Sequence, residues 1–201
     1  MRTVFSTVVV YSALFVVRSP VSGADATDPN PPEVAALSPM AAVKAQKYDR
    51  VTFHAAPKPL SKGAVTHDWK TFLGPTHNGV STETKLIRTF PAEGPRIVWE
   101  LETGDGYASP SIQGDYLIYV HRQKNEVVIE CLQPQTGDRY WEHRYSTSYA
   151  DRYGYSNGPR ASPLIDGERV HVLGVEGELI CLELATGRVI WQRNINSDFN
   201  V

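Results

Sequence analysis

The sequence has little net charge and no strongly basic stretch. Its 20 Lys and Arg residues are balanced by 22 Asp and Glu residues, so the net charge is −2 and the pI about 6.3. A protein that binds nucleic acid or an anionic membrane surface needs a basic patch to meet the phosphates. The sequence therefore predicts no nucleic-acid partner.

The motifs of common catalytic and metal sites are also missing. The 6 His residues are scattered without metal-ligand spacing, and the sequence contains no phosphate-binding loop, nucleophile elbow or His-x-x-x-His helix. Most acidic residues near the later strands stand in turns, where Asp has an ordinary structural role. We predict no catalytic residue and no metal ligand, which favours a binding protein over an enzyme.

Long apolar runs are absent except at the amino terminus. Arg2 gives a positive start, Val4–Val17 is largely apolar, and small residues follow Pro20. This pattern is typical of a cleaved secretory signal peptide, and the run is too short to span a bilayer. We predict a signal peptide over residues 1–26, no transmembrane segment, and a secreted or periplasmic location.

The next stretch, residues 27–66, is rich in Pro, Ala and Lys. It contains Asn30-Pro31-Pro32 and Pro57-Lys58-Pro59 and lacks the alternation of a strand. Such a composition favours an extended chain over a packed core. We predict a flexible tether, followed by a folded domain over residues 67–201.

Within that domain the sequence repeats itself. The segment Ala108–Gly114 returns as Ala161–Gly167, and further matches follow in the same order. These are Cys131-Leu132 with Cys181-Leu182, Thr136-Gly137 with Thr186-Gly187, and Trp141 with Trp191. A period of about 40–50 residues is the signature of stacked supersecondary units.

Each copy predicts four short strands, because runs of β-branched and aromatic residues alternate with Gly, Asp and Asn turns. The predicted strands are Ala108–Ile112, Tyr116–His121, Val127–Leu132 and Arg139–Tyr145, then Ser162–Ile165, Arg169–Gly174, Glu178–Leu184 and Arg188–Asn194. A four-stranded sheet with two apolar faces needs neighbours that cover both. We therefore predict an all-β fold made of β-propeller blades.

The tryptophans support the assignment of two complete blades and one partial blade. Trp141 and Trp191 lie on the fourth strand of each copy, and Trp99 marks a preceding partial blade. An indole offers a large apolar area, so these rings are expected to pack between blades. Gly137 and Gly187 suit a turn position with positive φ. Since a closed propeller has about 4–8 blades, we expect the remaining blades from sequence not present here or from another chain.

The two cysteines, Cys131 and Cys181, stand at equivalent points on the third strands. Equivalent points on adjacent blades are usually further apart than the roughly 4.4–6.8 Å between Cα atoms that a disulfide needs. We predict two small buried apolar side chains and no disulfide.

One connection departs from the blade pattern. The segment Ser146–Arg160 joins the two copies, and its Tyr, Arg and Asn side chains are of types that bind partners or anions well. Tyr107 takes the corresponding place before the first copy. The candidate binding residues are Tyr107, Tyr149, Asp151, Arg152, Tyr153, Tyr155, Asn157 and Arg160. The alternative is a loop that packs on its own aromatic residues against the next blade.

Two segments, Leu132–Trp141 and Leu182–Trp191, resemble the Ala-x-Asp-x-x-Thr-Gly-x-x-x-Trp repeat of pyrroloquinoline-quinone-type (PQQ-type) β-propellers. Gln133 and Glu183 stand at the Asp position, which departs from the repeat without affecting the fold. The upstream segment Asp68–Pro75 is similar to the leading segment of secreted PQQ-like propeller proteins of planctomycete bacteria.

The resemblance implies functions of different classes. Quinoprotein dehydrogenases hold PQQ and calcium in the axial channel and oxidise alcohols or sugars, and several carry adjacent Cys residues that are absent here. The outer-membrane assembly propeller uses no cofactor and presents loops and edges to partner proteins. We predict an exported, cofactor-free scaffold that binds a protein or small ligand on the propeller face. The alternatives are the amino-terminal part of a PQQ- and calcium-dependent dehydrogenase, or a carbohydrate-binding propeller.

Overall fold

The computed structural model describes residues 31–37 and 43–200, and the predicted signal peptide over residues 1–26 lies outside them. The regular structure of these residues is almost entirely β. The strands are β1 (Val51–Phe53), β2 (Trp99–Leu101), β3 (Ser111–Gln113), β4 (Tyr116–Gln123), β5 (Glu126–Leu132), β6 (Arg139–Ser146), β7 (Leu164–Asp166), β8 (Arg169–Leu173), β9 (Glu178–Glu183) and β10 (Val189–Asn194), and a short helix α1 (Ile195–Phe199) follows.

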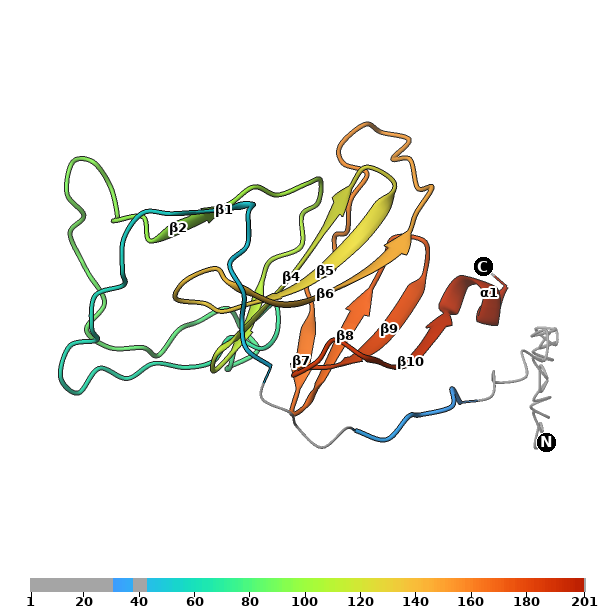
Figure 1. The fold of residues 1–201 in the computed structure, drawn as a ribbon, viewed down its shortest axis with the longest axis horizontal. Helices are drawn as coiled ribbons and strands as arrows, with labels where there is room; N and C mark the ends of the chain where they lie inside the picture. Colours follow the sequence, from blue (N-terminus) through green and yellow to red (C-terminus); the bar gives the residue numbers. More distant parts are fainter. Residues whose placement is uncertain (1–30, 38–42, 201) are drawn as a thin grey trace, which may run out of the picture.

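Two four-stranded antiparallel sheets follow one another along the chain (Figure 1). Their orders are β3-β4-β5-β6 and β7-β8-β9-β10, so each strand pairs with the next one in sequence. This is the predicted blade, and the all-β fold class is confirmed. The inner strands begin one residue after Pro110 and Pro163, because proline has no N–H to donate to a strand ladder.

The main core lies between these two sheets. Successive side chains of a strand point to opposite faces, so Val127, Ile129 and Cys131 of β5 face the second sheet, where they meet Val172 and Ile180. Removal of this apolar surface from water drives the stacking of one sheet on the other.

Cys131 and Cys181 are both buried and unpaired, as the spacing predicts. Burial raises the pKa of both thiols, because the thiolate is poorly solvated there. The two residues act as small apolar side chains of the strands.

A tryptophan docks across each boundary between sheets. The indole N–H of Trp141 donates to the carbonyl of Leu184 at 2.9 Å, and that of Trp99 donates to the carbonyl of Pro134 at 2.9 Å. At Gly187, where φ is +71°, an added Cβ would lie 2.5 Å from the Trp141 ring. Glycine is therefore required both by the backbone conformation and by the ring above it. Trp191 packs beside His171, with ring centroids 5.7 Å apart.

The sequence predicts a flexible tether for residues 27–66, but part of this span is paired with the sheets. The Ala35 N–H donates to the carbonyl of Ile190 at 3.0 Å, Gln46 bridges to Arg139, and β1 pairs with β2. The difference arises because these contacts are made by main-chain groups, which leave no pattern in the sequence. The predicted boundary of the folded domain at residue 67 stays a prediction.

Helical structure is slight in the part of the chain that the structure describes. The helix α1 begins after Asn194, whose side chain accepts a hydrogen bond from the Ser197 N–H at 3.0 Å. No helix of the described residues is long and apolar enough to cross a membrane.

Candidate functional site

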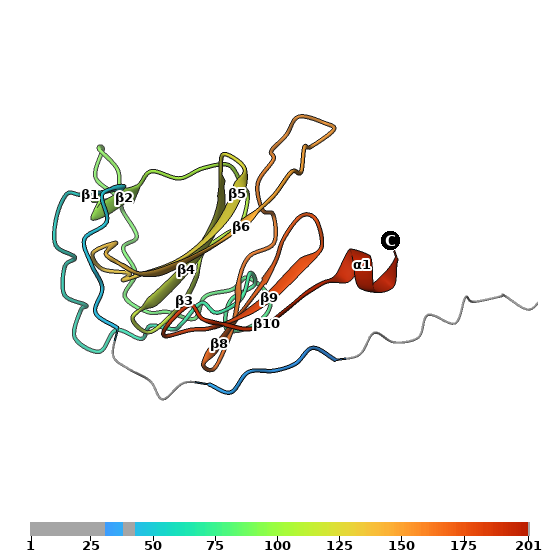
Figure 2. The same ribbon diagram turned by 45° about the vertical axis from the view of Figure 1, so that its right-hand side comes forward.

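The loop Ser146–Arg160 protrudes beyond the edge of the sheets in both ribbon views (Figures 1 and 2). A buried arginine, Arg122 at the end of β4, anchors its base. The Arg122 side chain donates to the main-chain carbonyls of Tyr149 and, at 3.0 Å, of Asn157. The main chain of Arg122 also pairs with Asp105, at 2.7 and 2.9 Å. Arg122 therefore holds both the loop Ser146–Arg160 and the segment around Asp105 against the first blade.

Asp151 organises the interior of the loop. Its carboxylate accepts from the main-chain N–H of Tyr155 at 2.7 Å, from Arg160 at 2.9 Å and from the Tyr149 hydroxyl at 3.2 Å. The main-chain N–H of Asp151 donates to Asn157 Oδ1 at 2.8 Å.

The pKa of Asp151 is consequently lowered, chiefly by the N–H of Tyr155 and further by Arg160 and Tyr149. The carboxylate is only 3% exposed. Asp151 therefore stays ionised and shapes the loop, with its oxygens already occupied by donors of the loop itself.

Three tyrosine rings point outward from this framework. Tyr107 is 61% exposed, Tyr153 67% and Tyr155 73%. The Tyr107 hydroxyl donates to the carbonyl of Tyr155 at 3.1 Å, and the Tyr153 and Tyr155 rings lie 6.3 Å apart. The guanidinium of Arg152 covers Tyr153 at 4.7 Å from the ring centroid. We call Tyr107, Arg152, Tyr153 and Tyr155 the tyrosine surface.

A groove of about 610 Å³ lies beside the tyrosine surface. Its walls are the segment 104–107 and residues of the loop, and several of them are Gly, Ser and Asn. Glycine lets the walls come together, because a Cβ at Gly158 would lie 2.0 Å from the carbonyl oxygen of Asp105. Such a groove offers hydrogen bonds to main-chain groups and stacking on aromatic rings, which are means of binding.

The candidate residues thus fall into two sets. One set holds the loop together and consists of Tyr149, Asp151, Asn157 and Arg160. The other set is the tyrosine surface, which faces outward. In the sequence, residue type marks all eight as candidates. Residue type does not distinguish those that support the loop from those that face solvent.

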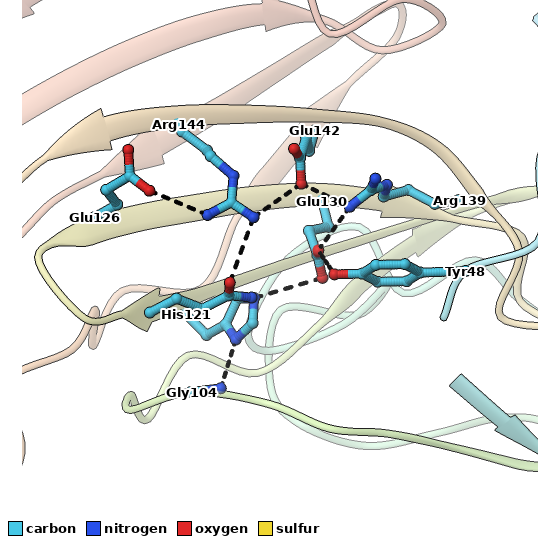
Figure 3. Close-up of polar contacts among 9 residues, drawn as sticks. Tyr48, Gly104, His121, Glu126, Glu130, Arg139, Glu142 and Arg144 are labelled. Carbon is cyan, nitrogen blue, oxygen red and sulfur yellow. Dashed lines mark hydrogen bonds and ion pairs between the residues drawn. The ribbon is translucent and has the colours of Figure 1, made fainter. Parts of the chain in front are cut away.

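A buried polar cluster on the first blade was not among the candidates (Figure 3). Glu130 of β5 and His121 of β4 are both fully buried. The hydroxyl of Tyr48 donates to Glu130 Oε1, Arg139 Nη1 lies 3.6 Å from the same oxygen, and His121 Nε2 lies 3.5 Å from Glu130 Oε2. The main-chain N–H of Gly104 donates to His121 Nδ1 at 2.7 Å.

The two ring nitrogens of His121 face different partners. Nδ1 accepts the main-chain N–H of Gly104, whereas Nε2 lies 3.5 Å from Glu130 Oε2 and 3.2 Å from the side-chain amide of Gln123. Burial acts to raise the pKa of Glu130, but the nearby His121, the hydrogen bond from Tyr48 and the charge of Arg139 outweigh it, so the pKa is lowered. Burial, with the hydrogen bond to Glu130, raises the pKa of Tyr48 to about 12, so Tyr48 remains the donor.

The cluster had one detectable signal in the sequence. Glu130 stands in the repeat where the second copy has Ile180, which is a core position. A carboxylate at a core position requires buried partners.

No group of three or more His, Cys, Asp or Glu side chains within the described ranges could hold a metal ion. The expected absence of a cofactor stays a prediction.

Stacked four-stranded antiparallel sheets with a tryptophan docked at each boundary define the class of protein as a β-propeller of PQQ-like blades. The PQQ_2 family model, described as outer membrane protein assembly factor BamB, matches residues 67–200. The chain belongs to this family.

Two relatives show how far the likeness extends. The outer membrane protein assembly factor BamB of Aliivibrio fischeri is 49% identical over 41 residues, which are 20% of this chain and 11% of that protein. The crystal structure of BamB from Moraxella catarrhalis matches with a TM-score of 0.37 and 24% identity, over 48% of this chain and 27% of that one. The matched part is thus a minor share of the length of either relative.

Proposed function

We propose that this chain is part of an exported propeller scaffold that binds a protein partner through the tyrosine surface and the adjoining groove. The observation that carries the proposal is that the three tyrosine rings are more than half exposed on a loop held by Arg122 and Asp151. Exposed aromatic side chains that are gathered in one patch mark an interaction site, whereas single exposed ones are common on protein surfaces.

The chemistry of the tyrosine surface suits a protein partner. Tyr and Arg are enriched among the residues that contribute most to protein–protein binding. Because the loop is already ordered, little conformational entropy would be lost when a partner docks. The curated relative is named an outer membrane protein assembly factor, which supports a partner in protein assembly and, with the predicted signal peptide, a location in the cell envelope.

Site-specific photo-crosslinking in cells of the source organism tests this function. A crosslinking amino acid at Tyr153 or at Tyr155 should capture the same protein, and Arg152→Ala should reduce its yield. Leu86, which is 59% exposed and outside the tyrosine surface, is the control position. Equal capture at all three positions, or none at Tyr153 and Tyr155, would reject the proposal.

A polysaccharide ligand is the second candidate. It is favoured by the groove of about 610 Å³, whose lining is rich in main-chain polar groups, beside rings on which a sugar could stack. Retention of the chain on immobilised polysaccharide, lost in Tyr153→Ala and in Tyr155→Ala, would favour this ligand over a protein.

The PQQ- and calcium-dependent dehydrogenase is the remaining alternative. Calcium takes about six to eight oxygen ligands, and the described part of the chain offers no cluster of acidic residues for it. Asp151 is already engaged by three donors of its own loop. These residues do not fit a calcium site, and no step of an oxidation is derived from them.

A further inference from the structure

The amino-terminal segment touches the outer edges of three successive sheets. Residues 31–37 pass beside β10, and residues 43–53 pass the start of β6 before pairing with β2 (Figures 1 and 2). At β6, Gln46 and Arg139 exchange two main-chain hydrogen bonds of 2.9 and 2.8 Å. We call residues 31–37 and 43–53 the rim strap.

One buried side chain, that of Tyr48, joins the rim strap to the interior of the first blade, and the partly buried Val51 packs beside it. Among the described residues of the strap only Tyr48 is buried, at 8% exposure. Its hydroxyl donates to Glu130, and the guanidinium of Arg139 lies over its ring at 4.2 Å from the centroid. Tyr48 therefore makes both a polar and a cation–π contact with the blade.

The contacts continue from Glu130 to the groove. Glu130 faces His121, and His121 accepts the main-chain N–H of Gly104 at 2.7 Å. Figure 3 shows Tyr48, Glu130, His121 and Gly104 as one connected series. Gly104 opens the segment 104–107, which forms one wall of the groove and ends in Tyr107.

We propose that this series is a positioning relay, in which the rim strap holds Glu130 and His121 through Tyr48, and these hold the Gly104 wall of the groove. The relay rests on the proposed function, since its output is the position of Tyr107. The strap thereby supports the binding site from a distance, and its release loosens the groove.

The physical reason is that the buried carboxylate depends on few donors. Glu130 Oε2 has no hydrogen-bond partner among the described residues, and Arg139 is 3.6 Å from Oε1. Removal of the Tyr48 hydroxyl would leave a buried charge without its one short hydrogen bond, which favours an open state of the cluster. The second blade has Ile180 at this place and needs no such relay.

Amide hydrogen exchange of the full chain, followed by NMR without any ligand, tests the relay. In Tyr48→Phe the exchange of the Gln46 and Gly104 amides should rise about tenfold relative to the natural sequence. The amides of β8 and β9 should be unchanged. The control is Tyr119→Phe, because Tyr119 packs on the same face but its hydroxyl forms no hydrogen bond with any described residue. It should leave all these rates unchanged.

A second variant reaches the relay from outside the cluster. Gln46→Pro removes the main-chain donor to Arg139 and leaves the buried side chains intact. It should also raise exchange at Gly104. If Gly104 keeps its original rate in either folded variant while Gln46 or its neighbours exchange faster, the strap does not position the groove and the relay is overturned.

The failures of the two proposals are distinguishable. Exchange at Gly104 requires no partner, so a confirmed relay with no crosslinked protein at Tyr155 would reject the partner and keep the relay. An unchanged exchange rate of the Gly104 amide together with normal crosslinking at Tyr155 would reject the relay and keep the partner.

Discussion

The first blade is covered on its two faces by different means. Toward the second blade, Ile129 and Cys131 meet Ile180 in an apolar core. On the opposite face lies a smaller apolar cluster around Leu117 and Leu132. The same face carries the buried polar pair Glu130 and His121. Tyr48 and Gly104, which cover this pair, come from segments outside any complete blade.

The two faces of the first blade show that neighbouring boundaries in a repeat protein can differ in what they accept as a neighbour. An apolar boundary is stabilised by area alone and accepts any well-shaped neighbour. A buried carboxylate accepts only a neighbour that brings donors to it, because an unpaired buried charge is costly. The apolar boundary can be repeated along a propeller. The boundary at Glu130 instead requires the rim strap, because Tyr48 of the strap supplies the hydrogen-bond donor.

A carboxylate placed at the apolar boundary between the two blades should destabilise the chain most. We expect Ile180→Glu to reduce the free energy of unfolding by more than about 4 kcal/mol, because its charge would be buried without partners. Ile180→Val is the matched control and should cost about 0.5–1.5 kcal/mol. Urea unfolding followed by tryptophan fluorescence measures both. If Ile180→Glu lost less unfolding free energy than Ile180→Val, water would have to reach the side chain at this boundary.

The docked tryptophans allow a finer comparison of the same two boundaries. Gly187→Ala should cost about 2–4 kcal/mol, because the new Cβ meets the Trp141 ring and the positive φ is strained. Gly137→Ala should cost less, since its Cβ would lie 3.1 Å from the ring of the half-buried Trp99 rather than 2.5 Å. Thermal unfolding of the two variants gives the order, and an equal or reversed order would contradict this account of the docking.

The blades could be predicted from the sequence because their signals are local. Alternation of apolar side chains, Gly-containing turns and one Trp per copy recur within each strand or hairpin, and six of the eight predicted strands match theirs to within about two residues. The two predicted inner strands begin too early, since β3 and β7 start only after Pro110 and Pro163. The loop residues were recognised by type, but their division depends on contacts such as that of Arg122 with Asn157, which are 35 residues apart.

The polar cluster and the rim strap could not be predicted in this way. Tyr48 and Glu130 are 82 residues apart, and nothing near Tyr48 in sequence indicates its partner. The strap pairs through main-chain groups at Gln46 and Ala35, which any residue type except proline supplies. Its Pro- and Ala-rich composition predicted a tether because composition reports on side chains alone.

Converting the polar boundary into an apolar one sharpens the comparison. We expect Glu130→Ile to cost about 1–3 kcal/mol, because the Tyr48 hydroxyl loses its acceptor and His121 loses its carboxylate neighbour in the interior. The triple variant Tyr48→Phe, His121→Leu and Glu130→Ile should recover part of this loss, since the buried hydroxyl and imidazole are removed with the carboxylate, although the Gly104 N–H loses its acceptor. Urea unfolding of both variants measures the free energies. A Glu130→Ile chain as stable as the natural one would show that the cluster has no role at the boundary.

The smallest expected effect is a dependence on pH. The pKa of Glu130 is lowered by folding, so its contribution is fully present above the ordinary carboxylate value of 4.5 and is lost as the pH falls through the lower pKa of the folded state. The difference in unfolding free energy between the natural chain and Glu130→Gln should be constant near neutral pH and shrink in acid. A difference that grew in acid would contradict the assigned ionisation.

The central claim is that the tyrosine surface binds a partner because its loop is held in one shape. Its most direct test is the yield of the photo-crosslinked protein at Tyr155 in the natural chain and in Asp151→Asn. Asp151→Asn changes no residue of the tyrosine surface, and position 155 carries the crosslinking amino acid in both chains. The substitution weakens the hydrogen bonds that the carboxylate accepts from the main-chain N–H of residue 155 and from Arg160. The account predicts a specific adduct in the natural chain and a yield about tenfold lower in Asp151→Asn. An equal yield in the two chains would contradict it.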